Sequence, residues 1–590
     1  MDMLAEALPR WNLADLYEHE QAPLLQEHLA LVERESLAFV AAYQGKIFSL
    51  SPQQLLEAIE KLEKIDQIAS RLYTYAGLKR AVNVNSAEIG QFYQTIMEKI
   101  TDFTTHLVFF RLEINALSAE AYAGLLKEPQ LKRWVIWLED IRRFKPHELP
   151  EQMEKLLQER AVAGSAAWVR LFDQLMAGLK IPLAGEDVTL DAALHQLSDH
   201  APAKRQQAAL ALGKTLASQA ETLSLIINTL IKDKEIDDRW RQFVRPVSRR
   251  NLDNRLADGV VDALVQAVRG RYSSLSHRYY RLKARWMGYE LLPWWERNAP
   301  LPQDKVELIS FAEAKDIILA AFADFSPELA AIAARFFAEG WIDAEPREGK
   351  MSGAFAHPAV PDSHPFIMVN YYGRLRDVMT LAHELGHGVH QLLAGAQGHF
   401  LSQTPLTLAE TASVFSEMLV FQRLVQRYSE PEQQKNLLAS KVEDMLNTVI
   451  RQIAFYSFEE KLHERRKEGE ITAHEIGDIW FSVQRESLGG AIKLDEDYRY
   501  FWGYISHFIH TPFYVYSYAF GDCLVNALYQ RYRAGLPNFE EHYKTLLKAG
   551  GAKDYAELLQ PLDFDLQNPA CWEQGLMLIE EYIDQLEKIA

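Results

Sequence analysis

His383, Glu384 and His387 form the sequence HELGH, the group of residues in this chain best suited to catalysis. On an α-helix each residue turns by about 100°, so the two histidines lie one turn apart on nearly the same face. Both imidazoles can then bind one metal ion. Glu384 lies about 60° around the axis from His387 and can reach a water molecule on that metal. This layout is typical of zinc peptidases.

The residues around the motif predict that it lies in the middle of a helix. Asp377 is placed to cap the first turn, the helix then runs from about 378 to about 393, and Gly395 suits its end. Apolar residues give this helix one core-facing side: Val378, Leu381, Ala382 and Leu385. Two histidines one turn apart are more often half-buried imidazoles than a metal site. The mid-helix position, where the one-turn geometry holds, favours the metal.

Three later residues are candidates for the third protein ligand that a catalytic zinc normally has. His390 shares the face of the two histidines but lies a turn further on, which favours a supporting or structural role. Glu410 belongs to a second predicted helix, and an antiparallel return would bring it to the metal. It could instead cap that helix together with Thr407. Glu417 lies two turns beyond Glu410 and could accept an imidazole N–H; spacing alone does not choose between the two glutamates.

The composition is that of an ordinary globular protein. The chain has 590 residues, 48% hydrophobic and 24% charged, enough to bury a large core and form two lobes or more. The net charge of −18 argues against nucleic acid or an anionic membrane as a partner. Two cysteines are too few for a disulfide framework, residues 1–10 show no secretory signal, and no stretch reaches the ~18–20 apolar residues of a membrane span. We therefore expect a cytoplasmic protein, of unknown oligomeric state.

Most of the chain has the apolar spacing of amphipathic helices, so the expected fold is mainly α. A short turn at 180–189 suggests a join between an N-terminal helical lobe, 1–190, and a catalytic domain, 191–590. No repeat of fixed period is visible, which disfavours a helical solenoid.

Two proline-rich segments, 291–303 and 349–373, interrupt the helical pattern. The first predicts a loop or the entry to a strand. The second contains the β-rich run Phe366–Tyr371, which predicts a strand in a small sheet beside the HELGH helix. An edge strand at this position could bind an extended peptide through its backbone, although a strand that only covers the core is an equal alternative.

These motifs resemble the oligoendopeptidase F family, within the wider group that includes thimet oligopeptidase. The resemblance covers most of the catalytic half, extends weakly back to about residue 165, and does not reach the first hundred residues. The matching stretches are GKMSGAF (349–355), HPFIMVNYYG (364–373), DVMTLAHELGHGVHQ (377–391), TPLTLAETASVFSEML (404–419), FEEKLHE (458–464) and WGYISHFIHTPFYVYSYAFG (502–521).

The resemblance implies a zincin-like, mostly helical metallopeptidase that cuts oligopeptides, rather than folded proteins, inside a deep substrate channel. It implies one Zn²⁺ per chain, bound by His383, His387 and Glu410, with Glu384 as the general base. The predicted reaction is hydrolysis of internal peptide bonds, in which Glu384 takes a proton from the attacking water and passes it to the leaving amine. A zinc exopeptidase such as a carboxydipeptidase is the nearer alternative. A non-catalytic, peptide-binding helical scaffold is the remoter one.

A second group of polar and aromatic residues lies in the segment 507–518. If Pro512 opens a helix, Tyr514 and Tyr518 share one face, whereas Tyr516 points elsewhere and is expected in the core. A hydrogen-bond donor near the reacting carbonyl can stabilise the oxyanion. The resemblance gives this role to His507 and Tyr518, with Tyr514 as a further catalytic candidate.

The resemblance also implies that substrate is contacted by three residues outside the metal motif: His510, Ala354 and Phe355. The chain departs from the family at Ile509, where a phenol is common. If that phenol contacts substrate, the change is expected to alter substrate preference or rate and to leave the zinc chemistry intact.

Overall fold

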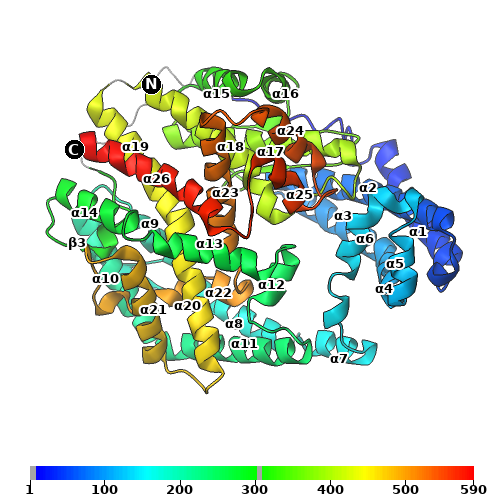
Figure 1. Ribbon diagram of the computed structural model, residues 1–590, viewed down its shortest axis with the longest axis horizontal. Helices are drawn as coiled ribbons and strands as arrows, with labels where there is room; N and C mark the ends of the chain where they lie inside the picture. The colour runs from blue at the N-terminus through cyan, green and yellow to red at the C-terminus, as the bar shows by residue number, and fades with distance from the viewer. Residues whose placement is uncertain (1–7, 162, 302–307, 429, 590) are drawn as a thin grey trace. The chain divides into compact units, whose positions relative to one another are not determined.

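The computed structural model describes residues 8–161, 163–301, 308–428 and 430–589. Residues 1–7, in the segment examined for a secretory signal, and 302–303, at the end of a predicted loop, lie outside these ranges. Where it is described, the protein is mainly helical with small β-sheets, as the sequence predicts (Figure 1). None of the described helices has an apolar stretch long enough to cross a membrane.

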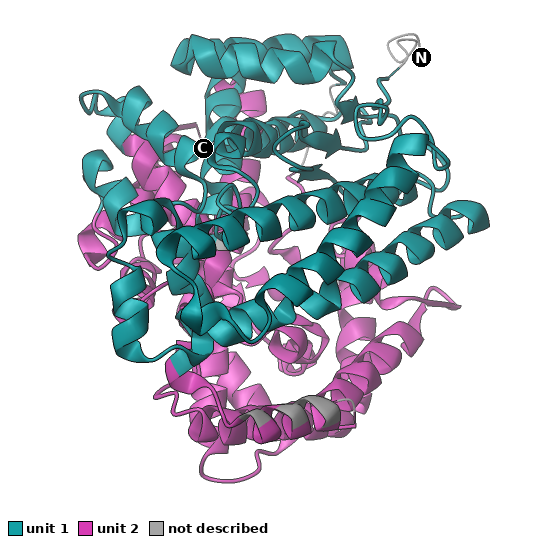
Figure 2. Ribbon diagram, turned by 90° about the vertical axis from the view of Figure 1, so that its right-hand side faces the viewer, with its two compact units in different colours: residues 1–145, 306–424, 531–564 teal, residues 146–305, 425–530, 565–590 magenta. Residues whose placement is uncertain are grey.

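The chain forms two compact units, each assembled from three separate segments (Figure 2). The first unit consists of 1–145, 306–424 and 531–564, and the second of 146–305, 425–530 and 565–590. The predicted join at residue 190 falls inside the second unit. As a domain boundary it stays a prediction.

The first unit contains helices from all three of its segments and one three-stranded sheet. Its elements are α1 (Pro23–Tyr43), α2 (Pro52–Ala81), α3 (Ala87–Thr105), α4 (Phe109–Ala116), α5 (Ala119–Leu125), α6 (Val135–Arg142), α15 (Phe311–Phe325), α16 (Pro327–Ala338), β4 (Ile342–Asp343), β5 (Phe355–His357), β6 (Phe366–Met368), α17 (Leu375–Ala394), most of α18 (Leu406–Arg427), α24 (Phe539–Ala549) and α25 (Tyr555–Leu559).

The predicted strand at 366–371 is present as β6, and the small sheet lies against α17, the helix that carries HELGH. The strand order is β4-β6-β5, so β6 is paired on both sides. The interpretation of this run as a peptide-binding edge is therefore wrong, because β4, which lies 24 residues earlier in the chain, occupies that side. In this sheet β5 is an edge strand. Its antiparallel pairing with β6 leaves its other side free of described strands.

Helix α17 begins earlier than the sequence suggests. Its first residue is Leu375, and Asp377 stands inside the first turn rather than at the cap. One carboxylate oxygen of Asp377 accepts the backbone N–H groups of Tyr372 and Arg374, both at 2.9 Å. The N-cap prediction was wrong by three residues because a carboxylate in the first turn can satisfy the free N–H groups from within the helix. The predicted end is correct, since the helix stops at Ala394 and Gly395 follows.

The second unit is a bundle of helices with two short sheets. Its elements are α7 (Glu151–Ala161), α8 (Ser165–Gly178), β1 (Ile181–Leu183), β2 (Glu186–Val188), α9 (Leu190–Gln196), α10 (Pro202–Ser218), α11 (Ala220–Trp240), α12 (Ser248–Asp253), α13 (Asp258–Gly270), α14 (Ser276–Trp286), β3 (Leu292–Pro293), α19 (Pro431–Met445), α20 (Arg451–Arg466), α21 (Ala473–Leu488), β7 (Ile492–Lys493), α22 (His507–His510), most of α23 (Tyr516–Arg533) and α26 (Pro569–Ile589).

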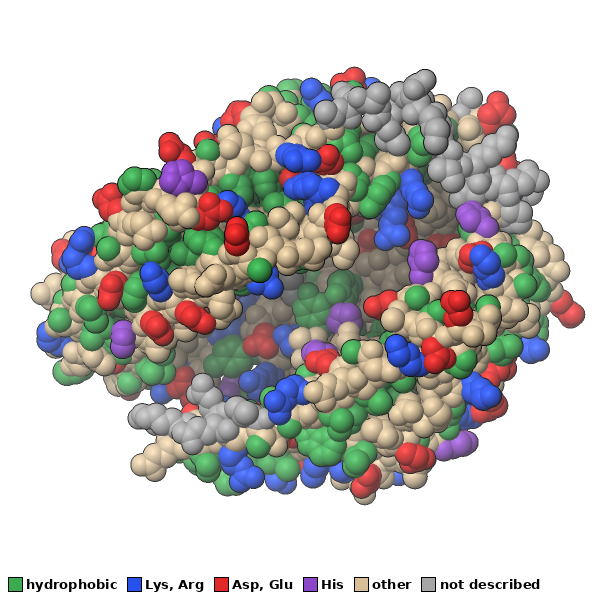
Figure 3. Space-filling view, turned by 180° about the vertical axis from the view of Figure 1, so that it is seen from behind, with side chains coloured by type: hydrophobic (Ala, Val, Ile, Leu, Met, Phe, Trp, Pro, Cys, Tyr) green, Lys and Arg blue, Asp and Glu red, His purple; other side chains and the backbone are tan. Residues whose placement is uncertain are grey.

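The C-terminal helix α26 packs against α13 and α19 (Figure 1). It also approaches α23 closely at Gly575, where an added Cβ atom would lie 2.2 Å from the carbonyl oxygen of Cys523. Both cysteines are buried and free, in agreement with the absence of a disulfide framework. On the face shown in Figure 3, acidic and basic side chains are intermixed.

Candidate active site

Helices α17 and α18 approach each other unusually closely at Gly386, inside the HELGH motif. A Cβ atom at this position would lie 2.5 Å from the carbonyl oxygen of Ala412, 2.6 Å from Cα of Ser413 and 2.7 Å from Oγ of Ser416. Only glycine permits this approach, because two of the three atoms belong to the backbone of α18. The contact places the first turns of α18 directly beside His383 and His387.

The side chains of His383, His387 and Glu410 converge as a group that could bind a metal ion. The Nε2 atoms of the two histidines are 3.2 Å apart, and the carboxylate oxygen of Glu410 lies 3.4 Å from each of them. Ligand atoms about 2.0–2.2 Å from a tetrahedral zinc are about 3.3–3.6 Å from one another. The donor set and its spacing therefore fit zinc.

Glu417 supports this group from behind. Its carboxylate lies 2.6 Å from Nδ1 of His383, so it accepts the proton on that nitrogen, and Nε2 is the nitrogen that would bind a metal after losing its own proton. Burial lowers the pKa of His383, but Glu417, with further help from Glu410, outweighs that effect and raises it to about 9. Of the two glutamates that spacing could not separate, Glu410 faces the two Nε2 atoms and Glu417 faces Nδ1.

The capping role considered for Glu410 is absent from the structure. Its carboxylate contacts the histidines and accepts a hydrogen bond from Oγ of Ser413 at 2.7 Å. Thr407, its proposed partner in a capping box, instead donates to the hydroxyl of Tyr555. Burial raises the pKa of Glu410, but the neighbouring His387 and His383 outweigh it and lower the pKa to about 2.

Glu384 lies between the two histidines in sequence and is 7% exposed. Burial raises its pKa, partly offset by His383 and His387. A carboxylate with a raised pKa is better able to exchange a proton with water near neutral pH.

His390 lies one turn beyond His387, is buried, and is 3.3 Å from Oγ1 of Thr404. Burial lowers its pKa to about 4, so its imidazole is neutral at neutral pH. It stands apart from the three-residue metal group, as its position in the sequence suggests.

In the second unit, the segment 507–518 brings three predicted residues together. Nε2 of His507 lies 3.2 Å from the hydroxyl of Tyr518, and the ring of Tyr514 stacks on His507 at 5.9 Å between centroids. Burial lowers the pKa of His507, which favours its neutral form. Tyr516 is fully buried, and its hydroxyl accepts a hydrogen bond from Asn254, as predicted for a core residue.

The prediction that Pro512 opens a helix is wrong. Helix α23 begins only at Tyr516, because Phe513 adopts a φ of 60°, which no right-handed helix allows. The resulting turn, rather than one helix face, places Tyr514 beside Tyr518, with centroids 5.3 Å apart. Its backbone is fixed by Glu459, whose buried carboxyl group accepts the N–H of Phe513 at 2.8 Å.

Two residues of this region were missed in the sequence. Glu459 lies in the matching stretch FEEKLHE, but no role was predicted for it; it is 2% exposed, and burial raises its pKa to about 8. Asp173 on α8 lies 2.8 Å from Nε2 of His510. Only the weak resemblance near residue 165 could have drawn attention to it.

Ala354 and Phe355 lie at the start of the edge strand β5, where both are half-buried. The ring of Phe355 packs against Trp11, with centroids 6.3 Å apart. Contact of either residue with substrate stays a prediction.

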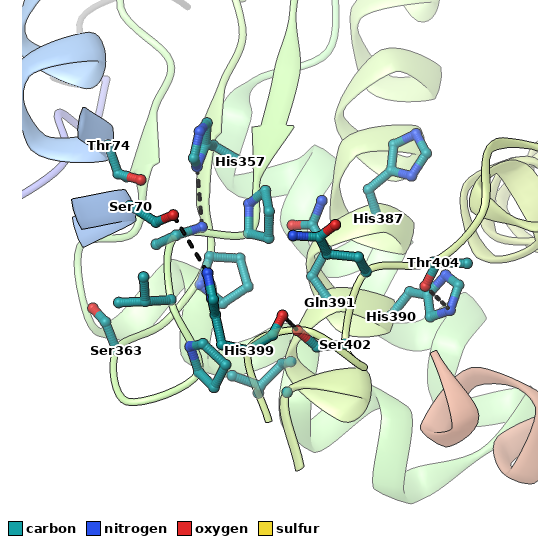
Figure 4. Close-up of a pocket in the computed structure, with 18 of the residues that line it drawn as sticks. Ser70, Thr74, His357, Ser363, His387, His390, Gln391, His399, Ser402 and Thr404 are labelled. Carbon is teal, nitrogen blue, oxygen red and sulfur yellow. Dashed lines mark hydrogen bonds between the residues drawn. The ribbon is translucent and has the colours of Figure 1, made fainter. Parts of the chain in front are cut away.

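A cavity of about 420 Å³ lies next to His387 (Figure 4). Its walls come from α2, from the loop around β5 and β6, from the end of α17 and from the loop that precedes α18. This cavity could not be predicted from the sequence, because its lining residues come from separate stretches of the chain.

Known proteins provide an independent comparison. The family model described as "Peptidase family M3" matches residues 195–578, and that described as "Oligopeptidase F" matches residues 113–181. The chain is 26% identical to oligopeptidase PepF of Bacillus subtilis over 98% of this chain and 87% of the relative. It is also 26% identical to the plasmid-encoded oligoendopeptidase F of Lactococcus lactis subsp. cremoris, over 98% and 97%.

Solved structures share the fold. A putative peptidase from Chlamydophila abortus superposes with a TM-score of 0.89 at 23% identity, covering 98% of both chains. An oligoendopeptidase F from Enterococcus faecium gives a TM-score of 0.70 at 22% identity, covering 96% of this chain and 97% of the other.

Proposed function

Because the chain belongs to peptidase family M3 and is a peptidase, we propose that it is a zinc-dependent endopeptidase that cuts internal bonds of short oligopeptides. The resemblance to the oligoendopeptidase F family is confirmed by relatives that align over nearly the whole chain. The observation that carries the proposal is the group formed by His383, His387 and Glu410, with donor atoms 3.2–3.4 Å apart.

One Zn²⁺ per chain would be held by these three residues. When bound, zinc supplies a Lewis acid that polarises the scissile carbonyl and lowers the pKa of water towards about 7. Glu417 keeps His383 in the tautomer that binds metal, through the 2.6 Å contact to Nδ1. Glu384 accepts a proton from the attacking water and delivers it to the leaving amine nitrogen, which completes the hydrolysis.

His507 and Tyr518 are proposed as donors to the oxyanion that develops on the scissile carbonyl, with Tyr514 packed beside them. Support for this role comes from the resemblance and from the contacts within the second unit. Removal of one such donor typically costs ~10²–10³ in rate. His510, Ala354 and Phe355 are proposed as substrate contacts on the resemblance alone. The proposed setting is cytoplasmic.

The test uses an internally quenched peptide with both ends blocked. Metal analysis of the purified protein should find about one zinc per chain, and the peptide should be cut at an internal bond, with activity lost in a chelator and restored by zinc. A carboxydipeptidase would leave the blocked peptide intact and cut its unblocked form. Absence of a stoichiometric metal, or cleavage that withstands its removal, would refute the zinc mechanism.

A further inference from the structure

The cavity beside His387 has the size of a binding site. Its volume, about 420 Å³, falls within the range of small-molecule pockets, which is about 300–1,000 Å³. His387 lines one side, as does Ala409, the neighbour of Glu410 in the chain. Ser70 and Thr74 of α2 lie on the opposite side from His387 (Figure 4). The cavity therefore extends away from the proposed metal group within the first unit.

The lining of the cavity carries no acidic residue, lysine or arginine among the described residues. Two of its histidines, His357 and His390, are neutral at neutral pH. Burial lowers the pKa of His357 to about 4, which leaves that imidazole neutral. Nε2 of His399 lies 2.8 Å from the carboxylate of Asp66. A charged group that entered this cavity would lose water without gaining a partner of opposite charge.

Two polar atoms in the wall lack a partner. Oε1 of Gln391 and Oγ of Ser363 are buried and make no hydrogen bond to the described residues. The amide of Gln391 is oriented by the bond from its Nε2 to the carbonyl of Ala356, so Oε1 is left as an acceptor. Buried polar atoms without partners are destabilising. Neither atom is exposed to the cavity as it stands, so a donor group of a ligand would satisfy one of them only after the side chain turned toward the cavity.

We propose that this cavity is a specificity site that binds one substrate side chain flanking the scissile bond, and that it selects large uncharged side chains with a hydrogen-bonding end, such as tyrosine. The inference rests on the proposed peptidase function, since it assumes that the peptide bond is cut at the group containing His387. Proline, valine and leucine residues supply the apolar part of the wall. Serine, threonine and glutamine residues, among them Ser363 and Gln391, supply the polar part.

The experiment compares end-blocked, internally quenched peptides that differ only in the residues on either side of the bond cut: tyrosine, lysine or aspartate. For the wild-type enzyme, kcat/KM should be about tenfold or more higher for tyrosine than for either charged residue on one side of the bond. Mass spectrometry of the products identifies that side. Equal kcat/KM for all three residues on both sides would overturn the inference.

The site itself is tested by changing its charge. Ser363→Asp should raise kcat/KM for the lysine peptide about tenfold relative to the tyrosine peptide. Ser363→Asn introduces a side chain of nearly the same shape as aspartate but without its charge, and it should not have this effect. If Ser363→Asp fails to fold, Gln391→Glu replaces it in the test and should give the same increase for the lysine peptide. Thr95→Asp, on the exposed side of α3, is the control for a distant charge and should leave the ratio unchanged.

Failure of the inference and failure of the proposed function give different results. A chelator-sensitive enzyme whose lysine-to-tyrosine ratio is the same in wild type, Ser363→Asp and Gln391→Glu would refute the specificity site alone. A folded wild-type protein that binds zinc but cuts none of the peptides, blocked or unblocked, would refute the proposed function.

Discussion

Gly386→Ala is expected to damage catalysis far more than it damages the fold. The new Cβ would lie 2.5 Å from the carbonyl oxygen of Ala412, where ordinary contacts begin at 3.4 Å, so the two helices would have to separate by about 0.9 Å. Overpacking of this kind costs about 1–3 kcal/mol, partly offset by the ~1 kcal/mol by which alanine is preferred in a helix. The net loss of stability should be about 2 kcal/mol or less.

The same separation moves Glu410, two residues before Ala412, relative to the two histidines. A displacement of about 1 Å at a catalytic group can cost about 10²-fold in rate, so kcat/KM should fall about 100-fold and zinc affinity should fall with it. The assays are peptide cleavage, zinc binding by competition with a chelator, and thermal unfolding. Gly90→Ala on α3, where an added Cβ meets nothing within 4 Å, is the matched control and should be neutral or stabilising. Wild-type activity and zinc affinity in Gly386→Ala would show that the close contact does not position Glu410.

The remaining predictions concern three carboxylates. Glu384→Gln should bind zinc normally and lose about 10²–10⁴-fold in kcat; near-normal turnover would disprove its role as the base. Glu417→Ala removes the partner of Nδ1 of His383 and should weaken zinc binding about 10–100-fold in chelator competition, and unchanged affinity would contradict the role given to that contact. Glu459→Gln keeps an acceptor for Phe513 but removes a carboxyl group whose pKa is raised to about 8. The folded protein binds that proton more tightly than the unfolded chain does. The wild type should therefore lose stability relative to the variant as the pH rises from about 4.3 to about 8. Urea unfolding at several pH values measures the difference in unfolding free energy between the two proteins, and a difference that stays constant with pH would refute this.

The parts of the site that depend on a single helix could be predicted from the sequence. The one-turn spacing of His383 and His387 and the apolar face of their helix are local properties, and α17 shows them as expected. Glu410 and Glu417 could not be distinguished, because the register of α18 against α17 is set by the contact at Gly386. That contact depends on tertiary packing, which cannot be inferred from the spacing of residues along the chain.

Features that depend on distant pairings were missed for the same reason. The turn at Phe513 is unexpected for an aromatic residue, since a positive φ is unfavourable without glycine. It is held by Glu459, which lies 54 residues earlier in the chain. The central place of β6 likewise depends on its pairing with β4, which has only two residues, Ile342 and Asp343, and so gives little sign of a strand in the sequence.

The three-segment construction of the first unit bears on when the enzyme can become active during synthesis. The helix with Glu410 is supported by Tyr543, whose hydroxyl donates to the carbonyl of Thr411 at 2.9 Å, and α24 also packs against α17. Both histidines and Glu410 leave the ribosome well before residues 531–564 exist, so a nascent chain lacks the support that fixes these ligands. Peptidase activity should therefore arise only after this last segment has been made. Unfinished polypeptides nearby, which are unfolded and open to cleavage, would then be exposed only to mature copies of the enzyme.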